Sequence, residues 1–255
     1  FVDQADWFSE WNGPFRDDVR SFVKSDRGAL KNLAARILAS PDIYFRQDTD
    51  INRCVNFVTC HDGFTLNDLV SYNEKHNEAN KEESRDGSNH NFSWNCGAEG
   101  DTEDPEIQQL RWQQIKNFLT VLFMSQGTPM LLMGDEIRHT QQGNNNAYCQ
   151  DNELSWFDWD LVEQHQDLLR FVKILIRFAK GLAIFREEKF LQVDKISSKP
   201  HILWHGQNLR QPDWSDDSHC LAFSLCHPPS GERLHVIFNA YWQPLQFELP
   251  SLKLG

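Results

Sequence analysis

Two short polar segments directly follow apolar runs of strand length, and they hold the side chains best suited to chemistry. His61 and Asp62 follow residues 54–60, and an Asp-Glu pair at residues 135–136 follows residues 130–133. A carboxylate beside an imidazole can stabilise positive charge, bind hydroxyl groups or move protons. The plain structural alternative is a helix N-cap for Asp62 and a turn with a cap for the second pair.

Aromatic residues form a second group with chemical potential, because flat apolar rings stack against sugar rings. The chain has nine tryptophans and 18 phenylalanines, most of which we expect in the core. Trp7, Trp11 and Trp94 lie in or near polar segments. These three tryptophans are therefore the candidates for contact with a sugar.

The sequence predicts no metal or cofactor site. His76, His90 and His139 lie in stretches without the spacing of metal ligands, so we expect them to be solvated. No acidic stretch has the regular oxygen spacing of a calcium loop, and residues 101–106 are interpreted as a solvated face. The six cysteines are scattered without a C-x-x-C pair, which predicts free thiols in a reducing compartment.

Composition excludes several classes of partner. The formal net charge of −12 disfavours phosphate backbones and anionic membrane surfaces, so neither nucleic acid nor a membrane is an expected partner. No apolar run approaches the ~20 residues that span a bilayer, and the first residues do not form a secretory signal. We expect a soluble protein of the cytoplasm, or of the plastid stroma in a photosynthetic eukaryote.

The first 181 residues alternate between strand and helix patterns. Apolar runs predict strands at residues 7–12, 54–60 and 130–133. Apolar residues at helical spacing predict helices at residues 15–24, 30–38, 65–72, 105–122 and 167–180. This β-α-β-α-β-α order is typical of part of a (β/α) barrel, in which chemistry lies at the carboxyl ends of the strands.

The pattern changes near residue 182 to short strand-like segments separated by Pro, Gly, Asp and Ser. These segments are residues 201–205, 220–226, 234–238 and 245–249. We therefore expect two domains, a barrel portion at residues 1–181 and an antiparallel β domain at residues 182–255. Residues 74–104 form a long polar connection of a length usually kept for function.

Five segments resemble the α-amylase superfamily of glycoside hydrolases in its isoamylase-like form. Residues 11–20, 55–72 and 127–136 resemble the family's segments at barrel strands six, seven and eight. Residues 89–97 and 143–152 resemble loops that mark the debranching enzymes of this family. The resemblance implies the fold class: α/β, the C-terminal part (strands 6–8) of a (β/α)8 TIM barrel followed by an all-β sandwich domain.

The resemblance also implies roles for the first pair of residues. Asp62 corresponds to the third catalytic carboxylate, a transition-state stabiliser, and His61 to a residue that hydrogen-bonds a substrate hydroxyl. The nucleophilic aspartate and the acid glutamate of the family belong to strands four and five, and residues 1–255 contain no matching segment. We therefore expect the isolated chain to be inactive.

The expected function of the whole protein is hydrolysis of α-1,6 branch points in glycogen, starch or limit dextrins with retention, without a cofactor. The alternative is a non-catalytic isoamylase-like subunit that binds glucan or regulates a partner. A transglycosylating or α-1,4-acting relative is a third option. The expected partner is an α-glucan polysaccharide, and the oligomeric state stays open.

Overall fold

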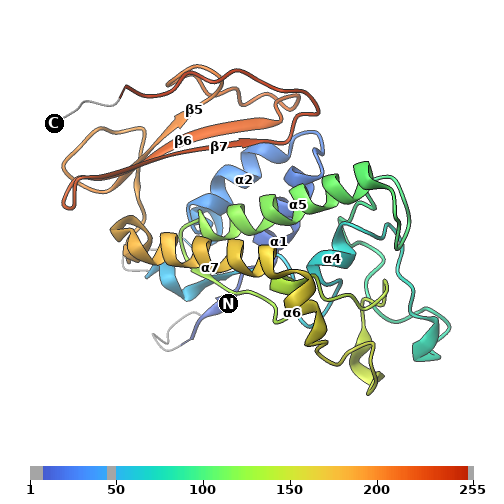
Figure 1. The fold of residues 1–255 in the computed structure, drawn as a ribbon. Coiled ribbons are helices and arrows are strands. Elements are labelled where there is room, and N and C mark those ends of the chain that lie inside the picture. The colour runs from blue at the N-terminus through green and yellow to red at the C-terminus, as the bar shows by residue number, and fades with distance from the viewer. Residues whose placement is uncertain (1–7, 45–49, 252–255) are drawn as a thin grey trace.

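The computed structural model describes residues 8–44 and 50–251, which form two sheets with helices packed between and beside them (Figure 1). The first sheet has three parallel strands in the order β1-β2-β3, with Glu10 opposite Cys54 and Val55 opposite Thr128. Its strands are β1 (Glu10–Trp11), β2 (Cys54–Asn56) and β3 (Thr128–Pro129). Because parallel neighbours need crossover connections, helices separate each strand from the next.

The long helices begin and end close to their predicted positions. The long helices are α1 (Gly13–Val23), α2 (Ala29–Ile37), α5 (Pro105–Phe123) and α7 (Gln166–Gly181). Asn12 caps α1 by accepting a bond from the Phe15 amide at 3.1 Å, and Asp104 accepts from the Glu106 amide at 2.9 Å at the start of α5. The helix expected at residues 65–72 is shorter, a single turn at α4 (Leu66–Leu69).

Short helical turns fill the connections. They are α3 (Pro41–Tyr44), α6 (Asp160–Gln164) and the 3-10 turns η1 (Ile51–Arg53), η2 (Glu78–Asn80), η3 (Asp135–Ile137), η4 (Ala147–Cys149) and η5 (Ala183–Arg186). No helix in the described ranges has both the length and the apolar character to cross a bilayer.

The strands of the first sheet are shorter than predicted, and the third is displaced. Residues 57–60 continue from β2 without pairing, and the strand expected at residues 130–133 is found at Thr128–Pro129 instead. Met133 is 72% exposed, which contradicts a buried strand there. An apolar run shows only that a segment is hydrophobic. A strand forms only where the backbone of a neighbouring strand lies in register with it.

The second sheet has four strands in the order β4-β5-β6-β7, seen edge-on across the top of Figure 1. They are β4 (Gln192–Val193), β5 (His201–His205), β6 (Cys220–His227) and β7 (Glu232–Asn239). The β4–β5 pair is parallel, and the other two pairs are antiparallel. The strand expected at residues 245–249 is wrong, since this segment is irregular and only the Glu248 amide bonds a neighbouring backbone, at the Gln207 carbonyl.

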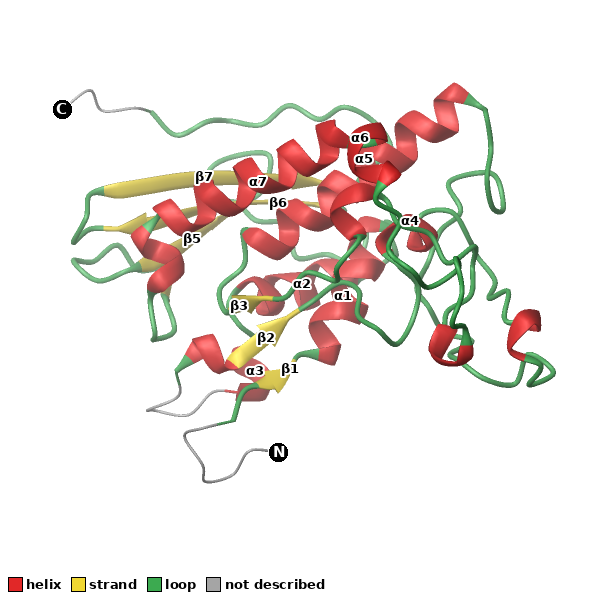
Figure 2. Ribbon diagram, turned by 60° about the horizontal axis from the view of Figure 1, so that its bottom comes forward, coloured by secondary structure: helices red, strands yellow, loops and turns green. Residues whose placement is uncertain are grey.

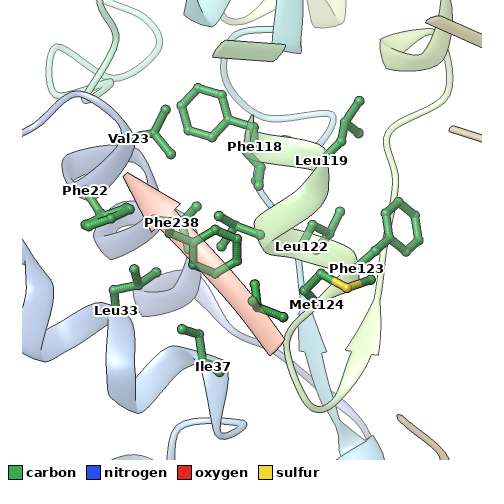
Figure 3. Packing of buried hydrophobic residues seen from close by; sticks show 14 of the residues in the cluster. Phe22, Val23, Leu33, Ile37, Phe118, Leu119, Leu122, Phe123, Met124 and Phe238 are labelled. Carbon is green, nitrogen blue, oxygen red and sulfur yellow. The ribbon is translucent and has the colours of Figure 1, made fainter. Parts of the chain in front are cut away.

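The strands described beyond residue 182 all belong to this one sheet, which packs on helices rather than on a second sheet (Figure 2). A single apolar cluster runs from the helices into the sheet: Phe238 of β7 lies between Leu33 of α2 and Leu122 of α5 (Figure 3). This cluster buries apolar side chains from both predicted regions, residues 1–181 and residues 182–255, and so stabilises them together. The two predicted regions therefore share one core.

Candidate active site

His61 and Asp62 follow β2 at the carboxyl edge of the parallel sheet, where Trp11 ends the neighbouring strand. The His61 ring lies 5.8 Å from the Trp11 ring in an edge-on arrangement, and Phe57 lies 5.6 Å from the same indole. Both His61 and Asp62 are exposed, and Trp11 is 49% exposed. The structure thus places the His61 imidazole beside an open tryptophan face, with the exposed Asp62 as its neighbour in the chain.

Arg16 adds a cation that the sequence did not single out. Its guanidinium lies 5.8 Å over the Phe57 ring, and Nε donates to Asp17 Oδ1 at 2.7 Å. The Asp17 hydrogen bond raises the pKa of Arg16, and the negative charge of Asp62 adds to the increase. The sequence could have indicated Arg16 by its position, because it lies in the first turns of the helix that follows β1.

The buried Arg20 holds residues 57–60, which link β2 to the His-Asp pair, by hydrogen bonds to the backbone. Arg20 donates from Nε and Nη2 to the Val58 carbonyl at 3.0 and 2.7 Å, and from Nη1 to the Asn91 carbonyl at 2.9 Å. Burial lowers the pKa of Arg20 to about 10, so it remains protonated at neutral pH. These three bonds replace the sheet pairing that residues 57–60 lack.

Asp135 is a positioning residue and not the cap of its own turn. Its buried carboxylate accepts bonds from the Thr59 hydroxyl and, at 2.8 Å, from the Leu66 amide at the start of α4. Burial raises the pKa of Asp135 to about 7. The N-cap of α4 is Thr65, which excludes the alternative reading of Asp62 as the cap of this helix.

Asparagines of the loop at residues 144–146 hold the turn that carries the His-Asp pair. The Asn145 carbonyl accepts from the Gly63 amide at 3.0 Å. The Asn145 side chain donates to Asn91 Oδ1 and accepts from Asn77 Nδ2, both at 2.9 Å. Gly87 packs so closely that an added Cβ would lie 2.1 Å from Asn145 Oδ1. The clue in the sequence was the concentration of asparagine in otherwise featureless loops.

Asp68 fixes the segment that leads into this loop. Its buried carboxylate accepts from the Thr140 hydroxyl at 2.5 Å, the Gln141 amide at 2.8 Å and the Gly143 amide at 3.2 Å. Burial raises the pKa of Asp68, and these bonds offset part of the increase. One carboxylate on α4 thus organises backbone more than 70 residues away in the chain.

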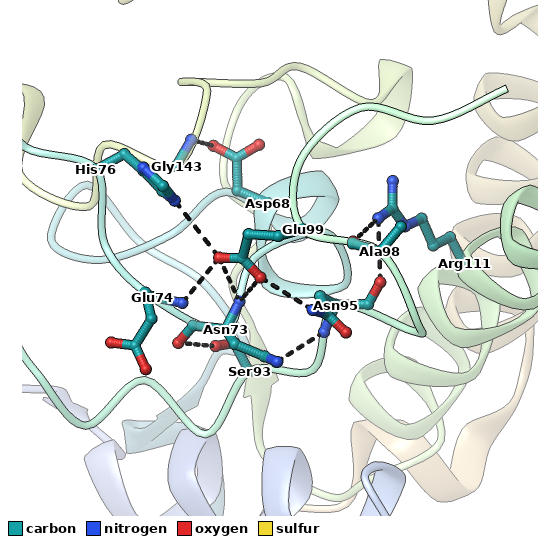
Figure 4. A network of polar contacts seen from close by, with 10 residues as sticks. All are labelled: Asp68, Asn73, Glu74, His76, Ser93, Asn95, Ala98, Glu99, Arg111 and Gly143. Carbon is teal, nitrogen blue, oxygen red and sulfur yellow. Dashed lines mark hydrogen bonds and ion pairs between the residues drawn. The ribbon is translucent and has the colours of Figure 1, made fainter.

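Glu99 accepts several hydrogen bonds within the long polar connection at residues 74–104, as Figure 4 shows. Its carboxylate accepts from the amides of Asn73 and Glu74 and from Asn95 Nδ2, each within 3.0 Å. Partial burial raises the pKa of Glu99, but the hydrogen bonds outweigh it and leave the pKa below its usual value. His76 is exposed, as expected, and its Nε2 lies 3.4 Å from Glu99 Oε1, so it is also part of this network.

The other predicted residues have different outcomes. Trp7 lies outside the described residues. Trp94 is partly buried against the core and lines a groove between α1, α5 and β7, so it is not part of the His61 cluster. His90 is exposed as expected, whereas His139 is only 8% exposed and burial lowers its pKa, which corrects the expectation of a solvated side chain.

The pairing of the cysteines and the clustering of acidic side chains bear on disulfide and metal chemistry. All six cysteines are free, as predicted, and Cys149 is the exposed one. In residues 8–44 and 50–251 no group of three or more His, Cys, Asp or Glu side chains is arranged to hold a metal ion. Asp17 is ion-paired with Arg16, Asp135 is buried against Thr59 and Leu66, and Asp62 is exposed.

The fold and the site define a mixed α/β protein with an exposed His-Asp pair beyond the end of a parallel strand. Residues 203–254 match the family model for the C-terminal region of isoamylases 1–3. The chain is 43% identical over 95% of its length to the glycogen operon protein GlgX homologue of Mycobacterium tuberculosis and 43% identical over 96% to chloroplastic isoamylase 1 of Oryza sativa subsp. japonica. It is related by sequence to the isoamylase-type debranching proteins over nearly its whole length, which confirms the resemblance.

The chain spans about a third of the length of these relatives, 36% of the mycobacterial protein and 30% of the rice protein. Among solved structures, a pullulanase mutant of Paenibacillus barengoltzii complexed with maltotetraose matches 96% of this chain and 33% of its own, with a TM-score of 0.69 and 23% identity. The pullulanase of Bacillus acidopullulyticus matches 95% of this chain with a TM-score of 0.68 and 20% identity. These two likenesses support the mixed α/β fold.

Proposed function

We propose that the protein containing this chain is a glycoside hydrolase that cleaves α-1,6 branch points of glycogen, starch or limit dextrins with retention. The observation that carries the proposal is the exposed His61–Asp62 pair beside Trp11 at the carboxyl edge of the parallel sheet. A relative that is 44% identical over 96% of the chain is named glycogen debranching enzyme, from Pectobacterium atrosepticum. The three parallel strands correspond in this proposal to strands six to eight of a (β/α)8 barrel, followed by a β domain from residue 182.

The chemistry assigns Asp62 a supporting role. Retaining hydrolysis needs a nucleophilic carboxylate and a carboxylic acid around an oxocarbenium-like transition state. Asp62, which is exposed, stabilises the developing positive charge and holds the distorted sugar. His61 binds a sugar hydroxyl, and the Trp11 ring offers an apolar wall to the same sugar.

The nucleophile and the acid then come from parts of the protein other than residues 1–255, and the chain alone is inactive. Arg16 and Asp135 act indirectly, because Arg16 balances the charge of Asp62 and Asp135 joins the end of β2 to α4. A soluble compartment, the cytoplasm or a plastid stroma, fits an α-glucan substrate.

The test is Asp62→Asn in the intact protein, assayed for release of linear chains from glycogen. We expect kcat to fall by about 10²–10³-fold, the effect of removing one preorganised electrostatic group. The thermal midpoint should stay unchanged, because residue 62 is exposed. Asp104→Asn, at the surface start of α5, is the matched control and should keep full activity. Full turnover by the Asp62→Asn variant removes this carboxylate from the mechanism.

The same assay separates the proposal from a non-catalytic glucan-binding subunit, the alternative that stays open because residues 1–255 contain no segment that matches the nucleophile or the acid of the family. If the parent protein binds glycogen without hydrolysing it, the subunit is the correct interpretation. Hydrolysis by the parent at α-1,4 bonds alone would instead indicate the α-1,4-acting class.

A further inference from the structure

Two hollows flank an exposed aromatic ridge, Tyr241 and Trp242, directly after the end of β7 and away from the His61 cluster. One, with a volume of about 490 Å³, lies between α1, α5 and the end of β7; the other, about 440 Å³, lies beside residues 206–219. Tyr241 lines both hollows. We propose that the ridge and its hollows form an accessory binding site for a linear α-glucan chain. The choice of glucan as ligand rests on the proposed function.

The ridge presents a flat aromatic surface to solvent. The rings of Tyr241 and Trp242 lie 3.9 Å apart at an angle of 34°, and the His219 ring is 5.8 Å from Trp242. Trp242 is 71% exposed, so the face of its ring is open to solvent. An amphipathic ring that stays open to water at one end and apolar over its face suits the C–H face of a sugar.

Backbone and side-chain bonds fix the ridge in place before a ligand arrives. The Tyr241 amide donates to Asn239 Oδ1 at 3.0 Å, and the Ala240 amide donates to the His219 carbonyl at 2.9 Å. His219 Nδ1 in turn lies 3.0 Å from the Ser25 hydroxyl at the end of α1. A platform held in this way loses little conformational entropy on binding.

The larger hollow is lined by groups that match sugar hydroxyls. Gln113, Gln114 and Asn117 face it from α5, and Asn239 faces it from β7. Amide side chains both donate and accept hydrogen bonds, as hydroxyl groups do. The charged residue of this lining is Lys24, which is paired with Asp26 at 3.4 Å. A nearly neutral, amide-lined hollow favours an uncharged polyhydroxyl ligand over an anion or a cation.

The floor of this hollow is part of the core, so it cannot close by local collapse. Val23 and Phe238 line it and are at most 8% exposed, and both belong to the cluster drawn in Figure 3. The second hollow lies across Tyr241 and has Gln207, Asn208 and Gln211 in its lining, together with Asp213 and with Asp217, which is ion-paired with Arg27 at 2.8 Å. A glucan chain crossing the ridge therefore meets amide groups on both sides of the aromatic rings.

The experiment uses Trp242→Ala in the intact protein, with retardation in glycogen-containing native gels and titration with maltoheptaose as readouts. We expect the glycogen affinity to fall at least about five-fold, while kcat on a short branched oligosaccharide stays within two-fold of the parent. Trp242→Phe keeps a ring and should retain most of the affinity, which also guards against a folding defect in the alanine variant. Phe178→Ala, a half-exposed ring on α7, is the matched control and should behave as the parent.

An unchanged glycogen affinity in Trp242→Ala overturns the inference. So does a change of oligomeric state in light scattering without a change of glucan affinity, which would make the ridge a contact with another protein chain. The proposed function is judged separately by Asp62→Asn, since loss of turnover there and loss of retention in Trp242→Ala are independent results.

Discussion

Asp135 offers a quantitative test of how burial controls the carboxyl edge of the sheet. Its carboxyl group is 1% exposed, and burial raises its pKa from 3.8 to about 7. The folded protein therefore holds this proton more tightly than the unfolded chain does. Between pH 4 and pH 7 the folded state binds more protons at this residue, so its contribution to stability decreases as the pH rises.

The size of the effect follows from the pKa shift. Each unit corresponds to about 1.4 kcal/mol, so the ionised carboxylate costs about 4 kcal/mol above pH 7 and nothing below pH 4. Asp135→Asn removes the charge, while the amide can still accept from the Leu66 amide and donate to the Thr59 hydroxyl. We expect the variant to match the parent near pH 4 and to exceed it by up to about 4 kcal/mol at pH 8.

The assay is urea unfolding of both proteins at several pH values from 4 to 8.5, read as the difference in the free energy of unfolding. Taking the difference cancels the pH dependence of the other carboxylates. Asp104→Asn keeps a capping oxygen at the exposed start of α5 and serves as the control for an aspartate-to-asparagine change at the surface. A difference between Asp135→Asn and the parent that stays flat from pH 4 to pH 8 would falsify the reasoning.

Two further substitutions test the scaffold beneath the site. Arg20→Met should lower the free energy of unfolding by about 3 kcal/mol, because the carbonyls of Val58 and Asn91 lose their buried donor. Arg20→Lys should recover part of this loss. Equal stability of Arg20→Met and the parent in urea would contradict the role of these hydrogen bonds. Phe118→Ala should cost about 3–5 kcal/mol through the cavity left between α1 and α5, measured by the same unfolding, and a loss below 1 kcal/mol would show that this part of the core is loosely packed.

The helices were predictable because their signals are local. The spacing of Phe15, Val19 and Phe22 indicated α1, and all three are buried. Pro105 marked the start of α5, with Asp104 as its cap. Both features depend only on residues within a few positions along the chain.

The strands were harder to predict, because pairing depends on distant residues. Residues 130–133 are apolar but unpaired, while β3 forms at Thr128–Pro129, where Val55 and Asn56 lie alongside. Residues 245–249 alternate in polarity as a strand would, yet they lie beside residues 207–209 with few backbone bonds. Alternation predicts which face a segment would bury and does not reveal whether a partner strand exists.

The sequence indicated where His61 and Asp62 lie but not the residues that hold them in place, and the functional role of the pair stays a prediction. The position of His61 and Asp62 after an apolar run was enough to place them at the carboxyl edge. The functions of Asp68, Asp135 and Asn145 rest on bonds to residues 54 to 76 positions away, which no local pattern encodes. Supporting carboxylates of this kind become visible only once the chain is folded.

The insertion of Phe238 between the helices has a consequence for the order of events during synthesis. The apolar sides of Leu33 and Leu122 leave the ribosome more than 100 residues before Phe238 does. Until β7 emerges, these surfaces stay uncovered and available to chaperones or to other nascent chains. The helical region can begin to fold early, but its interior becomes complete only when the late strand arrives.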